Sequence, residues 1–242
     1  LDLDELPVAV PVVSSLAAIM LFAVILSSPK IDATERSRVW AFVPLFIVNV
    51  GIWSVYLLSF TLTAEYGNDR TNLDLFGWQM PPAWVQSINP IFILILSSAF
   101  AAIWTKLGRR QPSTVVKWVL GFAAVGIAYL LFLPFIGTGA HGTPLLAVAG
   151  IILVWTIGEL LFSPTGLALT TKLSPRAFTS QMFALYFLSL AVGGAVSGTL
   201  AQLYDEQNEG PYFLALGIGT LVLAAVTLAI SPWVLRLMRG VR

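Results

Sequence analysis

Seven apolar runs, each long enough to cross a lipid bilayer, divide this chain of 242 residues. An α-helix needs about 20 mostly apolar residues to span the hydrocarbon core. The runs are Pro7–Leu26, Val39–Ala64, Ala83–Thr105, Val115–Phe135, Leu145–Thr171, Phe178–Tyr204 and Tyr212–Leu237, the second of them interrupted by Pro44 and Asn49. Because lipid cannot satisfy backbone polar groups, these runs predict an all-α fold, a polytopic membrane helical bundle.

The composition points to the same class of protein. Hydrophobic residues make up 57% of the chain and charged residues 10%, whereas a soluble domain carries charge on about a quarter of its residues. The expected surrounding is therefore the lipid bilayer. The absence of cysteine excludes disulfides and thiolate metal sites, and the net charge of +1 gives no indication of a nucleic-acid partner. Because the chain begins at Leu1, without the basic segment of a signal peptide, we expect it to be part of a longer protein.

Basic residues gather on alternate connections between the runs. Twelve of the thirteen fall on one side, namely Lys30, Arg36, Arg38, Lys106, Arg109, Arg110, Lys117, Lys172, Arg176, Arg236, Arg239 and Arg242. The other side holds Arg70 and most of the acids, and its longest loop is predicted over Tyr66–Pro82. Since basic loops stay in the cytoplasm, the pattern predicts a multi-pass protein of the cell membrane with a cytoplasmic C-terminus.

Glu159 is the one formally charged residue between Lys117 and Lys172. It lies near the middle of its apolar run, where a charge costs roughly 2.5–3.5 kcal/mol on insertion scales and usually faces a partner or a water-filled cavity. Pro164 removes a helical hydrogen bond one turn later, which is expected to loosen the helix. We therefore expect Glu159 to line a polar pathway. The alternative is a neutral side chain that hydrogen-bonds a neighbouring helix.

A second polar motif, Gln86–Pro90, opens the third run. The amide of Asn89 in this motif can both donate and accept hydrogen bonds. Either a polar ligand or a neighbouring helix would suit it, and considered alone the interhelical contact is favoured.

These motifs resemble the proton-dependent oligopeptide transporters of the major facilitator superfamily. Gln86–Ile93 is similar to that family's eighth helix and Gly158–Leu167 to its tenth, while Lys106–Ser113 and Leu237–Val241 resemble the loop after the eighth helix and the end of the twelfth. The resemblance implies a six-helix half of a major facilitator fold. Residues 29–242 would be the C-terminal half, and residues 1–28 an extra transmembrane helix in the linker between the halves.

The resemblance also implies a function and a site. The protein would carry di- and tripeptides across the membrane by proton symport, with the N-terminal half as partner and without a cofactor. Glu159 would face the amino terminus of the peptide, and Asn89 would help to hold it. The other implied substrate-binding residues are Ser163, Tyr186, Trp53 and Tyr56.

One departure from the family concerns the proton. The family's seventh helix usually places Glu and Gln after the aromatic residue that matches Tyr56, but here Leu57 and Leu58 follow it. That glutamate is commonly tied to proton coupling. The departure leaves two alternatives open, a carrier of another small solute with altered coupling and a non-transporting membrane sensor or scaffold. An enzyme is disfavoured, because His141 is the one histidine and Glu159 the one deep acid.

Overall fold

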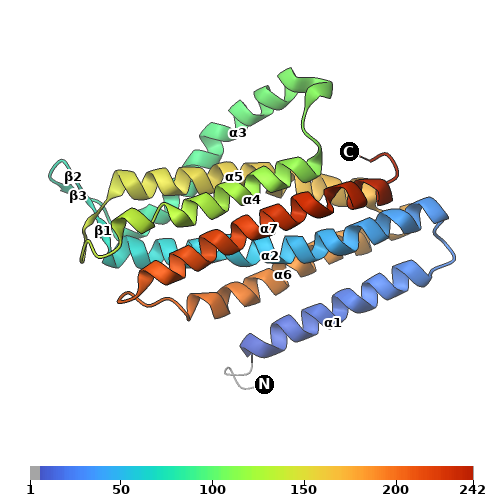
Figure 1. Ribbon diagram of the computed structural model, residues 1–242, viewed down its shortest axis with the longest axis horizontal. Coiled ribbons are helices and arrows are strands. Elements are labelled where there is room, and N and C mark those ends of the chain that lie inside the picture. Colours follow the sequence, from blue (N-terminus) through green and yellow to red (C-terminus); the bar gives the residue numbers. More distant parts are fainter. Residues whose placement is uncertain (1–5, 242) are drawn as a thin grey trace.

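The structure is a bundle of seven long helices (Figure 1). It is a computed structural model that describes residues 6–241, with side chains from residue 9 onward except that of residue 109. The helices are α1 (Leu6–Ser27), α2 (Ala33–Asp69), α3 (Ile88–Leu107), α4 (Thr114–Leu130), α5 (Leu145–Leu173), α6 (Thr179–Ala201) and α7 (Glu209–Leu237). Seven segments of the described part are long and apolar enough to span a membrane. The predicted all-α membrane bundle is therefore confirmed.

Short elements fill the connections at the two ends of the bundle. The 3-10 helices are η2 (Pro82–Ser87), η3 (Gly108–Arg110), η4 (Leu133–Phe135) and η5 (Arg176–Phe178). Strand β1 (Thr71–Asn72) pairs in parallel with β4 (Thr143–Pro144), and β2 (Asp74–Leu75) pairs antiparallel with β3 (Trp78–Gln79). All four strands lie at one end, which we name the acidic end. The opposite end, with the α1–α2, α3–α4 and α5–α6 connections, is the basic end (Figure 1).

Helix α2 is longer than its apolar run. A capping box starts it, in which the Glu35 N–H donates to Asp32 Oδ1 at 2.7 Å and the Asp32 N–H donates to Glu35 Oε2 at 3.3 Å. It continues through Pro44 and ends at Asp69. The predicted span of residues 39–64 was thus too short at both ends, and Tyr66, which we expected in a loop, is helical. Hydropathy misses the polar first and last turns, which project beyond the roughly 30 Å hydrocarbon layer.

The expected loosening of α5 at Pro164 is not seen. The helix runs without a break from Leu145 to Leu173. A proline inside a long helix is tolerated where neighbouring helices hold the helix from the sides. Glu159 is therefore presented by a regular helix.

The helices form a core of α2, α4, α5, α6 and α7, with α1 and α3 at its two edges. Helix α2 packs against α6 and α7, and α4 packs against α5 and α7. Helix α3 contacts the core mainly through α5, its far end diverges from the bundle, and none of its residues is buried (Figure 1). Helix α1 lies at the opposite edge, where it packs mostly on α6. The apolar surface of α3 is thus left without cover from the described residues.

Two glycines bring α4 and α5 into direct backbone contact. A Cβ on Gly158 would lie 2.8 Å from the Gly121 carbonyl oxygen, and a Cβ on Gly121 would lie 2.9 Å from the Gly158 carbonyl oxygen. Small residues at such crossings let membrane helices approach closely. The contact fixes the side of α5 that carries Gly158, the residue before Glu159.

Candidate functional site

The Glu159 carboxylate is held by donors from two other helices. The hydroxyl of Tyr56 on α2 donates a short hydrogen bond to Glu159 Oε2. The amide of Asn89 on α3 donates to the same oxygen at 3.3 Å and to Thr156 Oγ1 at 3.0 Å. Glu159 Oε1 receives no hydrogen bond from the described residues. Both donors therefore hold one oxygen and leave the other available.

This network joins three helices that are distant in sequence. Asn89 also lies 3.5 Å from the Tyr56 hydroxyl oxygen, so its amide reaches both α2 and α5. Thr156 donates its own proton to the Ile152 carbonyl oxygen at 2.8 Å, which leaves its oxygen free to accept from Asn89. Asn89 thus acts as an interhelical contact, as the residue alone suggested, and at the same time positions the carboxylate.

The free side of Glu159 faces a groove of about 390 Å³. Its lining comes from α2, α3, α5 and α6 and consists of Trp53, Ile93, Glu159, Leu160, Ser163, Pro164, Leu167, Tyr186, Phe187 and Leu190. Glu159 is the one formally charged group in this lining, and most of the other side chains are apolar. A charge beside apolar groups interacts more strongly with an opposite charge than the same charge does in bulk water.

Aromatic packing fixes the α2 wall of the groove. Phe162 of α5 packs edge-on against Trp53, at 5.4 Å between ring centroids, and against Tyr56, at 5.5 Å. On the other side, a Cβ on Gly193 of α6 would lie 2.7 Å from Trp53 Cβ. Only glycine lets α6 approach Trp53 this closely, so Gly193 has a packing role.

The α6 wall is formed by Tyr186. Its hydroxyl donates to the backbone carbonyl of Ser163 at 3.4 Å, and its ring fits against Gly166, where a Cβ would lie 3.1 Å from Tyr186 Cε2. Four of the six predicted site residues, Glu159, Ser163, Tyr186 and Trp53, therefore line one groove. Tyr56 and Asn89 approach Glu159 from behind it.

Leu57 and Leu58, which stand where the family usually has Glu and Gln, lie on α2 together with Trp53 and Tyr56. Leu58 is fully buried, and Leu57 is half-buried next to Gly194 of α6. Neither can bind a proton, so Glu159 is the ionisable carboxylate of this part of the bundle.

Thr156 was missed in the sequence, although a signal for it existed. It precedes Glu159 by three residues, and residues three apart share one face of a helix. A polar residue at that spacing from a deep carboxylate is a natural anchor for the groups that hold it.

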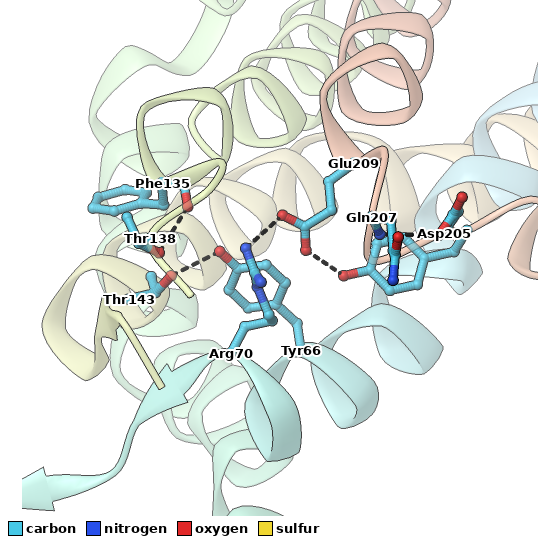
Figure 2. A network of polar contacts seen from close by, with 9 residues as sticks. Tyr66, Arg70, Phe135, Thr138, Thr143, Asp205, Gln207 and Glu209 are labelled. Carbon is cyan, nitrogen blue, oxygen red and sulfur yellow. Dashed lines mark hydrogen bonds and ion pairs between the residues drawn. The ribbon is translucent and has the colours of Figure 1, made fainter. Parts of the chain in front are cut away.

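A second polar network, also unforeseen, closes the acidic end (Figure 2). Arg70, just after α2, pairs with Glu209, the first residue of α7, at 2.8 Å between Nη2 and Oε2. The Tyr204 hydroxyl donates to Glu209 Oε1 at 2.8 Å, and burial together with this bond raises the pKa of Tyr204. Nearby, the hydroxyls of Tyr66 and Thr143 lie 2.8 Å apart. This network connects the C-terminal end of α2 with the N-terminal end of α7 and with the residues just before α5.

Comparisons with known proteins agree with the geometry. A family model described as the POT family matches residues 8–215. The chain is 38% identical over 234 residues to the uncharacterized transporter YclF of Bacillus subtilis and 35% identical over 239 residues to a di-/tripeptide transporter of Lactococcus lactis subsp. cremoris. Each alignment covers 96% of this chain, but 47% and 48% of the relative. The chain thus spans about half the length of the curated relatives it matches.

Solved structures show the same relation. A mutant of the peptide transporter POT in complex with alafosfalin matches with a TM-score of 0.90 and 38% identity, over 99% of this chain and 50% of that one. A POT family transporter in complex with 5-aminolevulinic acid matches with a TM-score of 0.87 and 35% identity, over 97% and 49% of the two chains. The fold is that of half of such a transporter, and the chain belongs to the POT family of peptide transporters, not to a family of enzymes.

Proposed function

We propose that this chain is the C-terminal half of a carrier that moves di- and tripeptides across the cell membrane together with protons. The observation that carries the proposal is the Glu159 carboxylate, which faces an apolar groove with one oxygen available. The peptide transporters among the relatives support peptides as the substrate. Residues 29–242 form the six-helix half in this proposal, and residues 1–28 the extra linker helix.

The groove suits the amino end of a peptide. The ammonium group pairs with Glu159 Oε1, while Tyr56 and Asn89 keep Oε2 in place. Trp53 and Tyr186 form the walls on either side, with Ser163 between them, and the apolar lining accommodates side chains of different shape. The N-terminal half covers the open side of the groove, as expected for a site between two repeats.

The transported proton needs a carboxylate on another helix than α2. No acid lies between Arg38 and Glu65 on α2, so that helix offers no carboxylate within the membrane. A carboxylate can bind either a proton or an ammonium group but not both at full strength. Alternation between the two partners at Glu159 alone would exchange peptide for proton, so in this proposal the proton that moves together with the peptide binds a carboxylate of the N-terminal half.

We predict that the acidic end faces outward and the basic end faces the cytoplasm, because basic connections stay inside. The chain has no cysteine, so single cysteines report topology cleanly once the other half is also cysteine-free. Asn72→Cys, exposed at the acidic end, should react with an impermeant maleimide in intact cells. Thr34→Cys, exposed at the basic end, should react only after permeabilisation. The reverse labelling pattern would contradict the orientation.

The function itself is tested with the full-length protein in proteoliposomes. We expect a dipeptide gradient to drive exchange of labelled dipeptide, and an inward proton gradient to drive its accumulation. Absence of both activities, in protein that is correctly inserted, would favour the non-transporting alternative. Exchange without accumulation would show a carrier that lacks proton coupling.

A further inference from the structure

A small cavity lies beside Asn89, one of the two residues that hold the Glu159 carboxylate. It is bordered by α2, η2, α3 and α5, and its polar lining consists of Ser59, Thr63, Gln86, Asn89 and Trp155. Its volume is about 10 Å³, which is roughly the space that one water molecule needs. Such a site holds water only if the polar partners number two or more.

One side chain of the lining carries an unsatisfied donor. The indole Nε1–H of Trp155 is buried without a hydrogen-bond partner among the described residues, and the side chain is 2% exposed. The ring is clamped on α5 by Tyr129, at 5.1 Å between centroids, and by Phe132, at 5.7 Å. Buried donors in folded proteins are nearly always paired with protein or ordered water. Trp155 therefore indicates a bound water.

The cavity also has acceptors. The Ser59 hydroxyl donates to the Tyr56 carbonyl oxygen at 2.6 Å, and the Thr63 hydroxyl donates to the Ser59 carbonyl oxygen at 2.5 Å. With their protons used in this way, both hydroxyl oxygens can only accept. The two amide protons of Asn89 are shared among Thr156, Glu159 and Tyr56, and its Oδ1 accepts no hydrogen bond from the described residues.

We propose that this cavity is a single-water site, and that its water accepts from Trp155 Nε1–H and donates to Asn89 Oδ1. The water then fixes which way the Asn89 amide points. In that orientation Nδ2 faces Glu159, so Trp155 acts as a positioning residue for the candidate site without touching the groove. This role rests on the proposed function, whereas the water site itself does not.

The water is tested by a crystal structure of the full-length transporter at a resolution that shows ordered solvent. We expect one density peak within hydrogen-bond distance of both Trp155 Nε1 and Asn89 Oδ1. An empty cavity, or a peak that contacts only one of these atoms, would overturn the proposal. This outcome does not depend on transport activity.

The positioning role is tested by dipeptide exchange with Trp155→Phe, beside Trp118→Phe as matched control. Trp118 is also a buried indole, but its N–H donates to Thr165 Oγ1 at 3.1 Å, away from the cavity. We expect Trp155→Phe to raise KM roughly three- to tenfold, the worth of one hydrogen bond, with the maximal rate unchanged and the control close to wild type. A KM no higher than that of the control overturns the role. Failure of the wild type to exchange would instead refute the proposed function.

Discussion

Replacement of Glu159 by Gln is expected to reduce dipeptide uptake by roughly tenfold or more, the range for loss of a charged hydrogen bond, while expression and folding persist. The Gln side-chain carbonyl can still accept from Tyr56 and Asn89, which now donate to Glu159 Oε2. The interhelical network therefore survives the change, but the negative charge that faces the groove is lost. Uptake of labelled dipeptide by the full-length protein in proteoliposomes measures the effect.

Glu206→Gln is the matched control. Glu206 is exposed in the connection between α6 and α7, so the same chemical change there removes a charge without touching the groove. We expect uptake by this variant to equal that of the wild type. Wild-type uptake by Glu159→Gln, or equal losses in the two variants, would rule out Glu159 as the substrate's partner.

The second large effect is expected at the acidic end. Removal of one partner of a buried ion pair leaves an uncompensated charge and costs roughly 3–5 kcal/mol. The Arg70 and Glu209 side chains are 11% and 2% exposed, so Glu209→Gln should markedly lower the melting temperature of the full-length protein in detergent. The remaining Gln can still accept from Tyr204, which isolates the loss of charge.

A double variant separates the pair from general damage. Arg70→Met together with Glu209→Gln removes both charges, and a buried pair can often be replaced by neutral groups at little cost. We therefore expect the double variant to melt well above Glu209→Gln. Arg70→Met made alone completes the comparison. If the double variant loses as much stability as the two single variants added together, the two side chains do not stabilise the fold as a pair.

The number and order of the helices could be predicted because each span is a long apolar run. The boundaries were less predictable. The capping box of Asp32 and Glu35 adds a polar turn to α2 that a hydropathy scan excludes. The expectation of a loosened α5 at Pro164 was wrong, since the helix is continuous.

Part of the candidate site could be predicted from the sequence, because Glu159 is an isolated charge. A lone carboxylate in an apolar run directs attention to Glu159, and the resemblance supplied Asn89, Tyr56, Trp53 and Tyr186. The contacts that hold these residues and close the acidic end could not be predicted from the sequence. The contact of Asn89 with Thr156 spans 67 residues, and that of Arg70 with Glu209 spans 139. Such pairings depend on how helices pack, which a single sequence does not reveal.

The most direct test of the account is competition between a free dipeptide and its N-acetyl derivative for uptake by the wild type and by Glu159→Gln. Acetylation removes the ammonium group and leaves the rest of the peptide intact. If Glu159 binds the amino end, the wild type should prefer the free dipeptide by roughly tenfold or more, and the variant should lose this preference. An equal preference in both proteins would contradict the account, because it would place the partner of the amino group elsewhere.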